Sequence, residues 1–179
     1  MIDRPDLDEQ DFINRLRLRD DLRDLRRSAG LSCRAVSFAA GLNHRAIHEA
    51  ESTLQWSVAR VQRWARALDR RFTMTIVGLS LPDDDDFEAE LLRLATPFGG
   101  ADADHLHVRA VVNDLRRIHW AQGLSNQALA KKIGGSNRAI ARWAEKPHAC
   151  YLKTLQRYAR GLGGSLALEV VPVNVAVSA

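Results

Sequence analysis

An internal repeat is the strongest constraint on this 179-residue chain. Residues 31–52, LSCRAVSFAAGLNHRAIHEAES, align without a gap with residues 124–145, LSNQALAKKIGGSNRAIARWAE, at an offset of 93. Seven of the 22 aligned pairs are identical: Leu31/Leu124, Ser32/Ser125, Ala35/Ala128, Gly41/Gly134, Arg45/Arg138, Ala46/Ala139 and Ile47/Ile140. Residues 57–68 and 151–162 continue the similarity at an offset of 94, so the repeated unit has the size of a domain.

Each copy predicts two short helices joined by a tight turn. In the first copy, Ser32 is suited to cap the first helix, because its hydroxyl can accept from the free N–H groups of the first turn. Gly41 can adopt the left-handed backbone of a helix stop, and we expect Asn43 to cap the second helix. The corresponding residues of the second copy are Ser125, Gly134 and Ser136.

The second helix of each copy has an apolar side and a polar side. We expect the buried side to hold Ile47 with Ala50 in one copy, and Ile140 with Trp143 in the other. The outward residues are mostly polar, and many are long enough to reach the edges of DNA bases. They are His44, Arg45, His48 and Glu49 in the first copy and Asn137, Arg138, Ala141 and Arg142 in the second.

Further elements flank each pair of helices. A helix is predicted over residues 11–28, with Leu18, Leu22 and Leu25 inward, and another over 105–121. The inward residues of the second are Val108, Val111, Leu115 and Ile118. Alternating residues predict strands at 72–77 and 166–171. Because a lone strand leaves backbone groups unpaired, we expect these strands to pair, either within one chain or between chains.

These elements predict a mainly α fold with two helical domains, at residues 1–80 and 104–179, each ending in a short strand. An acidic linker, residues 81–103, joins them and contains a short helix at about 87–95. Residues 1–80, 81–104 and 105–179 carry net charges of +3, −7 and +8. Two basic segments suit a polyanion contacted at two places, although charge runs also serve simply as solvated surface. For the linker, a solvated segment is favoured over a mimic of DNA.

The repeated residues resemble those of lambda-repressor-like (Cro/repressor, XRE-type) helix-turn-helix domains, twice over most of the chain. The tandem arrangement is similar to that of immunity repressors of temperate mycobacteriophages, which bind short asymmetric sites. The resemblance implies that the start of each second helix enters the major groove. The position that grips phosphate falls on Asn126 and on Cys33, which departs from the usual polar residue. The candidate DNA-binding residues are Ser32, Arg34, Asn43, His44, Arg45, His48, Glu49, Ser125, Asn126, Gln127, Ser136, Asn137, Arg138, Arg142 and Lys146.

The function expected from this resemblance is sequence-specific transcriptional repression, as in phage immunity and lysogeny. Because the two outward sets differ, we expect a monomer to bind an asymmetric site on double-stranded DNA. The N-terminus lacks a secretory pattern and no stretch is apolar enough to span a bilayer, which favours the cytoplasm of a bacterial host. The alternative is an antitoxin whose DNA-binding fold also sequesters a toxin, although antitoxins of this fold usually carry a single such domain.

No catalytic, metal or cofactor motif accompanies the repeat, and we expect neither an enzyme nor a small-molecule ligand. His44 and His48 have a metal-compatible spacing, but the zinc-protease pattern requires glutamate where Arg45 stands. We expect His105 and His107 to be capping or surface groups. The two cysteines lie far apart and indicate neither a disulfide nor a metal site. Trp64 and Trp143 are expected in the core, while Trp56 and Trp120 have no assignment.

Overall fold

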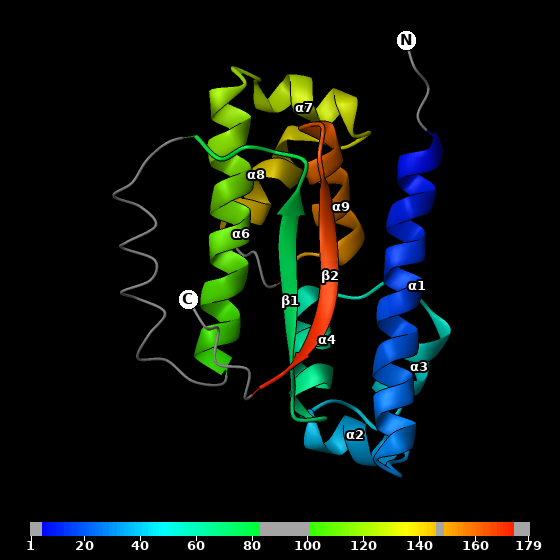
Figure 1. Ribbon diagram of the computed structural model, residues 1–179. Helices are drawn as coiled ribbons and strands as arrows, with labels where there is room; N and C mark the ends of the chain where they lie inside the picture. The colour runs from blue at the N-terminus through cyan, green and yellow to red at the C-terminus, as the bar shows by residue number, and fades with distance from the viewer. Residues whose placement is uncertain (1–4, 83–100, 146–148, 174–179) are drawn as a thin grey trace. The chain divides into compact units, whose positions relative to one another are not determined.

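The computed structural model describes residues 5–82, 101–145 and 149–173. The chain is mainly helical with a small two-stranded antiparallel sheet (Figure 1). Contacts divide it into two compact units, one made of the described residues through Thr73 and from Leu168 on, the other of Met74–Ala167. The helix expected at 87–95 lies outside the described residues. No described helix is both long and apolar enough to cross a membrane.

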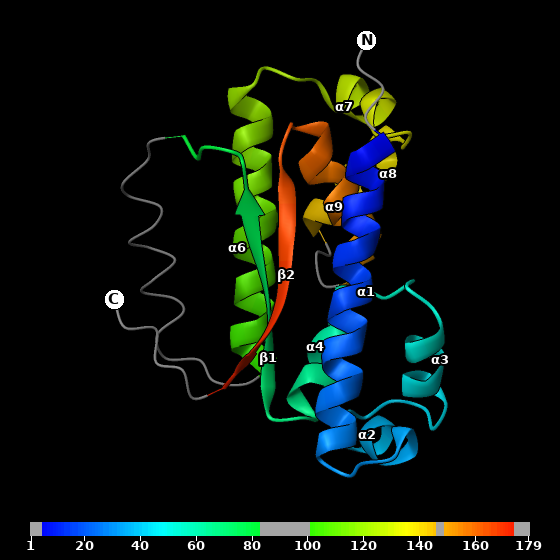
Figure 2. The same cartoon turned by 45° about the vertical axis from the view of Figure 1, so that its right-hand side comes forward.

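Four helices belong to the first unit: α1 (Pro5–Ser28), α2 (Cys33–Ala39), α3 (Ala46–Ser52) and α4 (Val58–Arg66). Helix α3 packs against both α1 and α2, and α2 lies next to the C-terminal end of α1 (Figure 2). The predicted inward positions Leu18 and Leu22 are fully buried, whereas Leu25 is half-buried. The other large side chains of this core are Ile47, Trp56, Trp64 and Phe72.

The second unit contains α6 (Ala101–Ala121), α7 (Asn126–Lys132), α8 (Asn137–Glu145) and α9 (Leu152–Gly161). Helix α8 packs against α6 and α7, and α9 packs against α7. All four inward positions predicted for α6 are buried. Burial of a leucine-sized side chain stabilises a fold by about 1.5–3 kcal/mol, so this apolar face holds α6 in the unit. The other large buried side chains include Leu129, Leu152, Leu155, Tyr158 and Leu166.

Strands β1 (Arg70–Val77) and β2 (Ser165–Pro172) are hydrogen-bonded neighbours. The two strands therefore pair within one chain, one of the two arrangements that the sequence allows. On the part of β1 in the second unit, the backbone N–H of Met74 donates to Nε2 of His107 at 2.9 Å. The expectation that His107 is a capping or surface group is wrong, because its ring accepts from a strand backbone. His105 is exposed, as expected.

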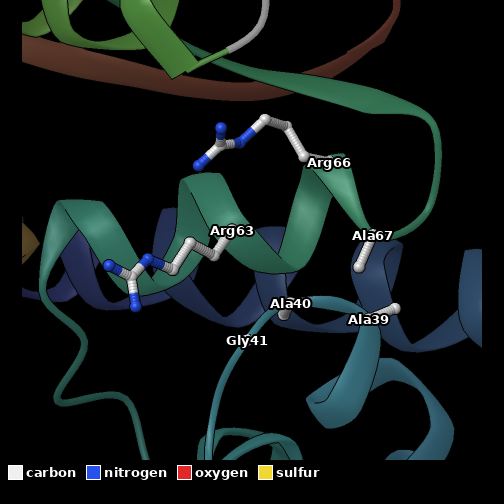
Figure 3. Close-up of a pocket in the computed structure, with 6 residues that line it drawn as sticks. All are labelled: Ala39, Ala40, Gly41, Arg63, Arg66 and Ala67. Atoms are coloured by element: carbon white, nitrogen blue, oxygen red, sulfur yellow. The ribbon is translucent and has the colours of Figure 1, made fainter.

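At one pair of neighbouring positions the two units carry residues of different size. In the first unit, a pocket of about 350 Å³ is lined by Ala39, Ala40, Gly41, Arg63, Arg66 and Ala67. Figure 3 shows the side chains of Arg63 and Arg66 extending along α4, away from the alanines. In the second unit, Ile133 and Gly161 replace Ala40 and Ala67. A Cβ at Gly161 would lie 2.5 Å from Cγ2 of Ile133, so glycine here accommodates the larger neighbour.

Gly161→Ala is expected to lower the free energy of unfolding by about 1–3 kcal/mol, the usual cost of overpacking a core. The new methyl group would also lie 2.6 Å from Cδ1 of the fully buried Leu129. Denaturant unfolding measures the loss. As a control, Gly161→Ala combined with Ile133→Ala should cost less than the sum of the single changes. Stabilisation by Gly161→Ala, as helix propensity alone predicts, would contradict this packing.

Candidate nucleic-acid interface

The first helix of each motif is capped as the sequence predicts. The Oγ of Ser32 accepts from the backbone N–H of Ala35 at 3.1 Å, and Ser125 Oγ accepts from Ala128 at 3.1 Å. After each helix the chain turns at a glycine with a φ of +62° or +63°, at Gly41 and Gly134. A residue with a Cβ would be strained at this φ. Each hydroxyl still has an O–H to donate, because its capping bond uses only a lone pair.

The second helices do not begin at equivalent positions. Ser136 Oγ accepts from the N–H of Ala139 at 3.2 Å and α8 begins at Asn137, as expected of a helix cap. Asn43 Oδ1 instead accepts from Arg45, two residues on, at 3.0 Å. The prediction that Asn43 caps the second helix is therefore wrong. Its carboxamide closes a turn that precedes α3, as asparagine commonly does.

The outward residues of both motifs are exposed wherever the structure describes them. His48 and Glu49 lie on α3, while His44 and Arg45 lie in the turn before it. The structure does not describe Lys146 or the side chains of Arg142 and Trp143. The exposed candidates in the first unit are Ser32, Arg34, Asn43, His44, Arg45, His48 and Glu49, and those in the second are Ser125, Asn126, Gln127, Ser136, Asn137 and Arg138.

A largely buried ion pair holds α3 to α1 in the first unit. Arg26 donates from Nε to Oε1 of Glu51 at 2.6 Å and from Nη2 to Oε2 at 3.0 Å. A third bond, from Nη1, reaches the carbonyl of Leu31 at 2.8 Å. The side chains are only 10% and 13% exposed. Two parallel bonds to one carboxylate fix the orientation of both partners, so the pair positions the end of the second motif helix.

The same carboxylate affects two neighbouring groups. Its hydrogen bond raises the pKa of the Arg26 guanidinium. Burial, and then the charge of Glu51, raise the pKa of the Cys33 thiol. The neutral thiol therefore places no negative charge at the position where the resemblance implies a phosphate contact. Neither cysteine forms a disulfide; Cys33 is half-buried and Cys150 is buried.

Two tryptophans support the C-terminal end of α3. Trp56 is 1% exposed and donates from Nε1 to the carbonyl of Ala50 at 3.0 Å. Its ring meets that of Trp64 edge to face, with centroids 5.9 Å apart and planes at 82°. Such a pair adds about 0.5–1.5 kcal/mol to its area burial. Trp56, which has no assignment from the sequence, is therefore a core residue, and Trp64 is buried as predicted.

The second unit uses different residues at these places. His119 aligns with Arg26 at the offset of 93, and its Nδ1 lies 3.2 Å from the Tyr158 hydroxyl. Tyr158 aligns with Trp64, and burial raises its pKa to about 12. Cys150 aligns with Trp56. All three aligned pairs differ between the copies. A comparison of the two copies could therefore have indicated that these positions are related. Nothing in one copy alone identifies Glu51 as the partner of Arg26.

Trp120 lies on the surface of the second unit, with 62% of its area exposed. The guanidinium of Arg116, one helical turn earlier on α6, lies 4.8 Å from its ring centroid. This arrangement is a cation–π contact, worth about 0.5–1 kcal/mol at an exposed site. Trp120 therefore packs against a neighbour on its own helix, α6.

The exposed motif surfaces offer hydrogen-bond donors and positive charge. Arg34 and Arg45 are exposed in the first unit, and Lys131, Lys132 and Arg138 in the second.

Within the described part of the chain, no three His, Cys, Asp or Glu side chains are placed to hold a metal ion. Searches for similar proteins give no matching family model, no matching curated protein and no matching solved structure.

Proposed function

We propose that this chain is a sequence-specific DNA-binding protein that acts as a transcriptional repressor. The observation that carries the proposal is the repeated motif itself, with a serine-capped helix, a left-handed glycine and a second helix with an exposed polar face. A capped helix pair of this kind suits the docking of the second helix in the major groove, where base edges carry a distinct hydrogen-bond pattern. In this proposal the two units are lambda-repressor-like domains.

The proposed operator is asymmetric and is bound by a single chain. The first unit offers His44, Arg45 and Glu49 to the bases, whereas the second offers Asn137 and Arg138. Two different reading sets suit two different half-sites in a fixed orientation. A dimer of identical single-motif chains reads a palindrome instead, because it places identical helices in both half-sites. Occupation of such a site at a promoter would exclude RNA polymerase and repress transcription.

Arg138→Ala is expected to relax the choice of base at one position of the site. Arginine at the start of a recognition helix can donate two hydrogen bonds to O6 and N7 of guanine, which discriminates by about 1–3 kcal/mol. Titration of a set of single-base operator variants measures this discrimination.

The matched control for Arg138→Ala is Lys131→Ala, which also removes one exposed positive charge from the second unit. We expect this change to weaken binding equally for all variants and to lower the salt slope by about one. Uniform weakening by Arg138→Ala would assign that residue to a phosphate. An affinity for DNA that does not respond to salt would contradict the proposed function.

A further inference from the structure

The recognition helix of the second unit starts with a regular α-helical hydrogen bond. The N–H of Ile140 donates to the carbonyl of Ser136, four residues earlier, at 3.2 Å. Asn137 and Arg138 are therefore the first two residues of α8. Their Cα–Cβ directions are set by the helix.

In the first unit, the equivalent N–H has a different partner. The N–H of Ile47 donates to Oγ of Ser37, in α2, at 3.2 Å. The carbonyl of Asn43 accepts instead from Ala46, three residues later, at 3.0 Å. Helix α3 consequently begins at Ala46, and the preceding Arg45 has φ −100° and ψ −9°.

Two differences between the copies account for the different starts. Ser37 is fully buried, so its hydroxyl is held against α3, whereas the aligned Ala130 has no hydroxyl to offer. Asn43 accepts from the N–H of Arg45 through its side chain, whereas the aligned Ser136 reaches three residues on. Both differences favour a turn in the first unit and a helix in the second.

We propose that Ser37 and Asn43 are positioning residues that make the first unit present His44 and Arg45 from a turn rather than from a helix. The proposal deepens the proposed function and rests on it. Arg45 and Arg138 occupy the same repeat position, but the backbone of Arg45 is in a turn and that of Arg138 is in a helix. Their side chains therefore project in different directions. A bidentate contact with guanine depends on direction, so the same arginine has a different base preference in each unit.

The test gives the first unit the residues of the second, Ser37→Ala with Asn43→Ser, in the full chain. The first readout needs no DNA: the Cα chemical shifts of residues 44 and 45 should move to helical values. Asn43→Asp keeps a side-chain oxygen and is the matched control, with shifts expected at their original values. Unchanged shifts in the double variant would overturn the proposal.

The second readout is base preference, measured by selection from random duplexes. The double variant should change the preferred base by about ten-fold or more in the half-site of the first unit only. An unchanged preference there would overturn the proposal. If the original chain has no base preference at all, the proposed function fails, while the chemical shifts still test the positioning by Ser37 and Asn43.

The reciprocal variant, Ala130→Ser with Ser136→Asn, keeps the test decisive if the first double variant does not fold. We expect it to move the Cα shifts of residues 137 and 138 away from helical values. It should also change base preference in the half-site of the second unit alone. Helical shifts retained at both residues would overturn the assignment of the two positions.

Discussion

Glu51→Ala is expected to lower the free energy of unfolding by about 3 kcal/mol, near the lower end of what breaking a buried ion pair costs. The change leaves the guanidinium of Arg26, whose side chain is 10% exposed, with its bond to the Leu31 carbonyl but without its carboxylate. Desolvating a charge without its partner is unfavourable, and the anchor between α1 and α3 is lost. Denaturant unfolding measures the loss as a shift of the midpoint.

Two controls separate the charge from the packing in this prediction. Asp20→Asn weakens the more exposed pairs of Asp20 with Arg19 and Arg23, and should change stability by less than about 1 kcal/mol. Arg26→Met combined with Glu51→Leu removes both charges and should recover much of the loss. A loss no larger for Glu51→Ala than for Asp20→Asn would show that the pair does not hold α3.

The second large effect is expected on DNA affinity. Alanine at both His44 and Arg45, or at both Asn137 and Arg138, should weaken binding by about 10²–10⁴-fold, because one chain then keeps a single reading unit. The full chain is needed for this experiment, since β1 and β2 pair with each other and separate halves would each leave a strand edge unpaired.

Binding titrations on one operator, with the mass of the complex measured alongside, provide the readout. Similar losses from both variants, at one chain per duplex, are the expected result. Full affinity in either variant would show that the altered unit does not bind DNA and serves only as a scaffold.

Much of the fold follows from local signals in the sequence. A serine before an apolar periodic segment predicts a cap, and the hydroxyls of Ser32 and Ser125 make that bond. The glycine of each turn, the buried faces of α1 and α6 and both strands are likewise confirmed. Each of these features depends on residues that are close together in the sequence. They can therefore be predicted before any tertiary contact is known.

The features that sequence reasoning missed depend on competition or on distant partners. Asn43 can accept from more than one N–H, and the choice follows partly from the hydroxyl of Ser37 on another helix. Glu51 is 25 residues from Arg26. His107 is 33 residues from the N–H of Met74, and only the fold brings them within hydrogen-bond distance. Neither hydrophobic periodicity nor motif spacing predicts contacts between residues this far apart in the sequence.

Selection of bound sequences from a pool of random DNA duplexes, using the full chain at physiological salt, tests the central claim most directly. We expect enrichment of one asymmetric sequence with two different half-sites about one helical turn, roughly 10 bp, apart or at a multiple of that spacing. A palindrome would contradict binding by a single chain with two different reading sets. Recovery of no enriched sequence would contradict sequence-specific DNA binding itself.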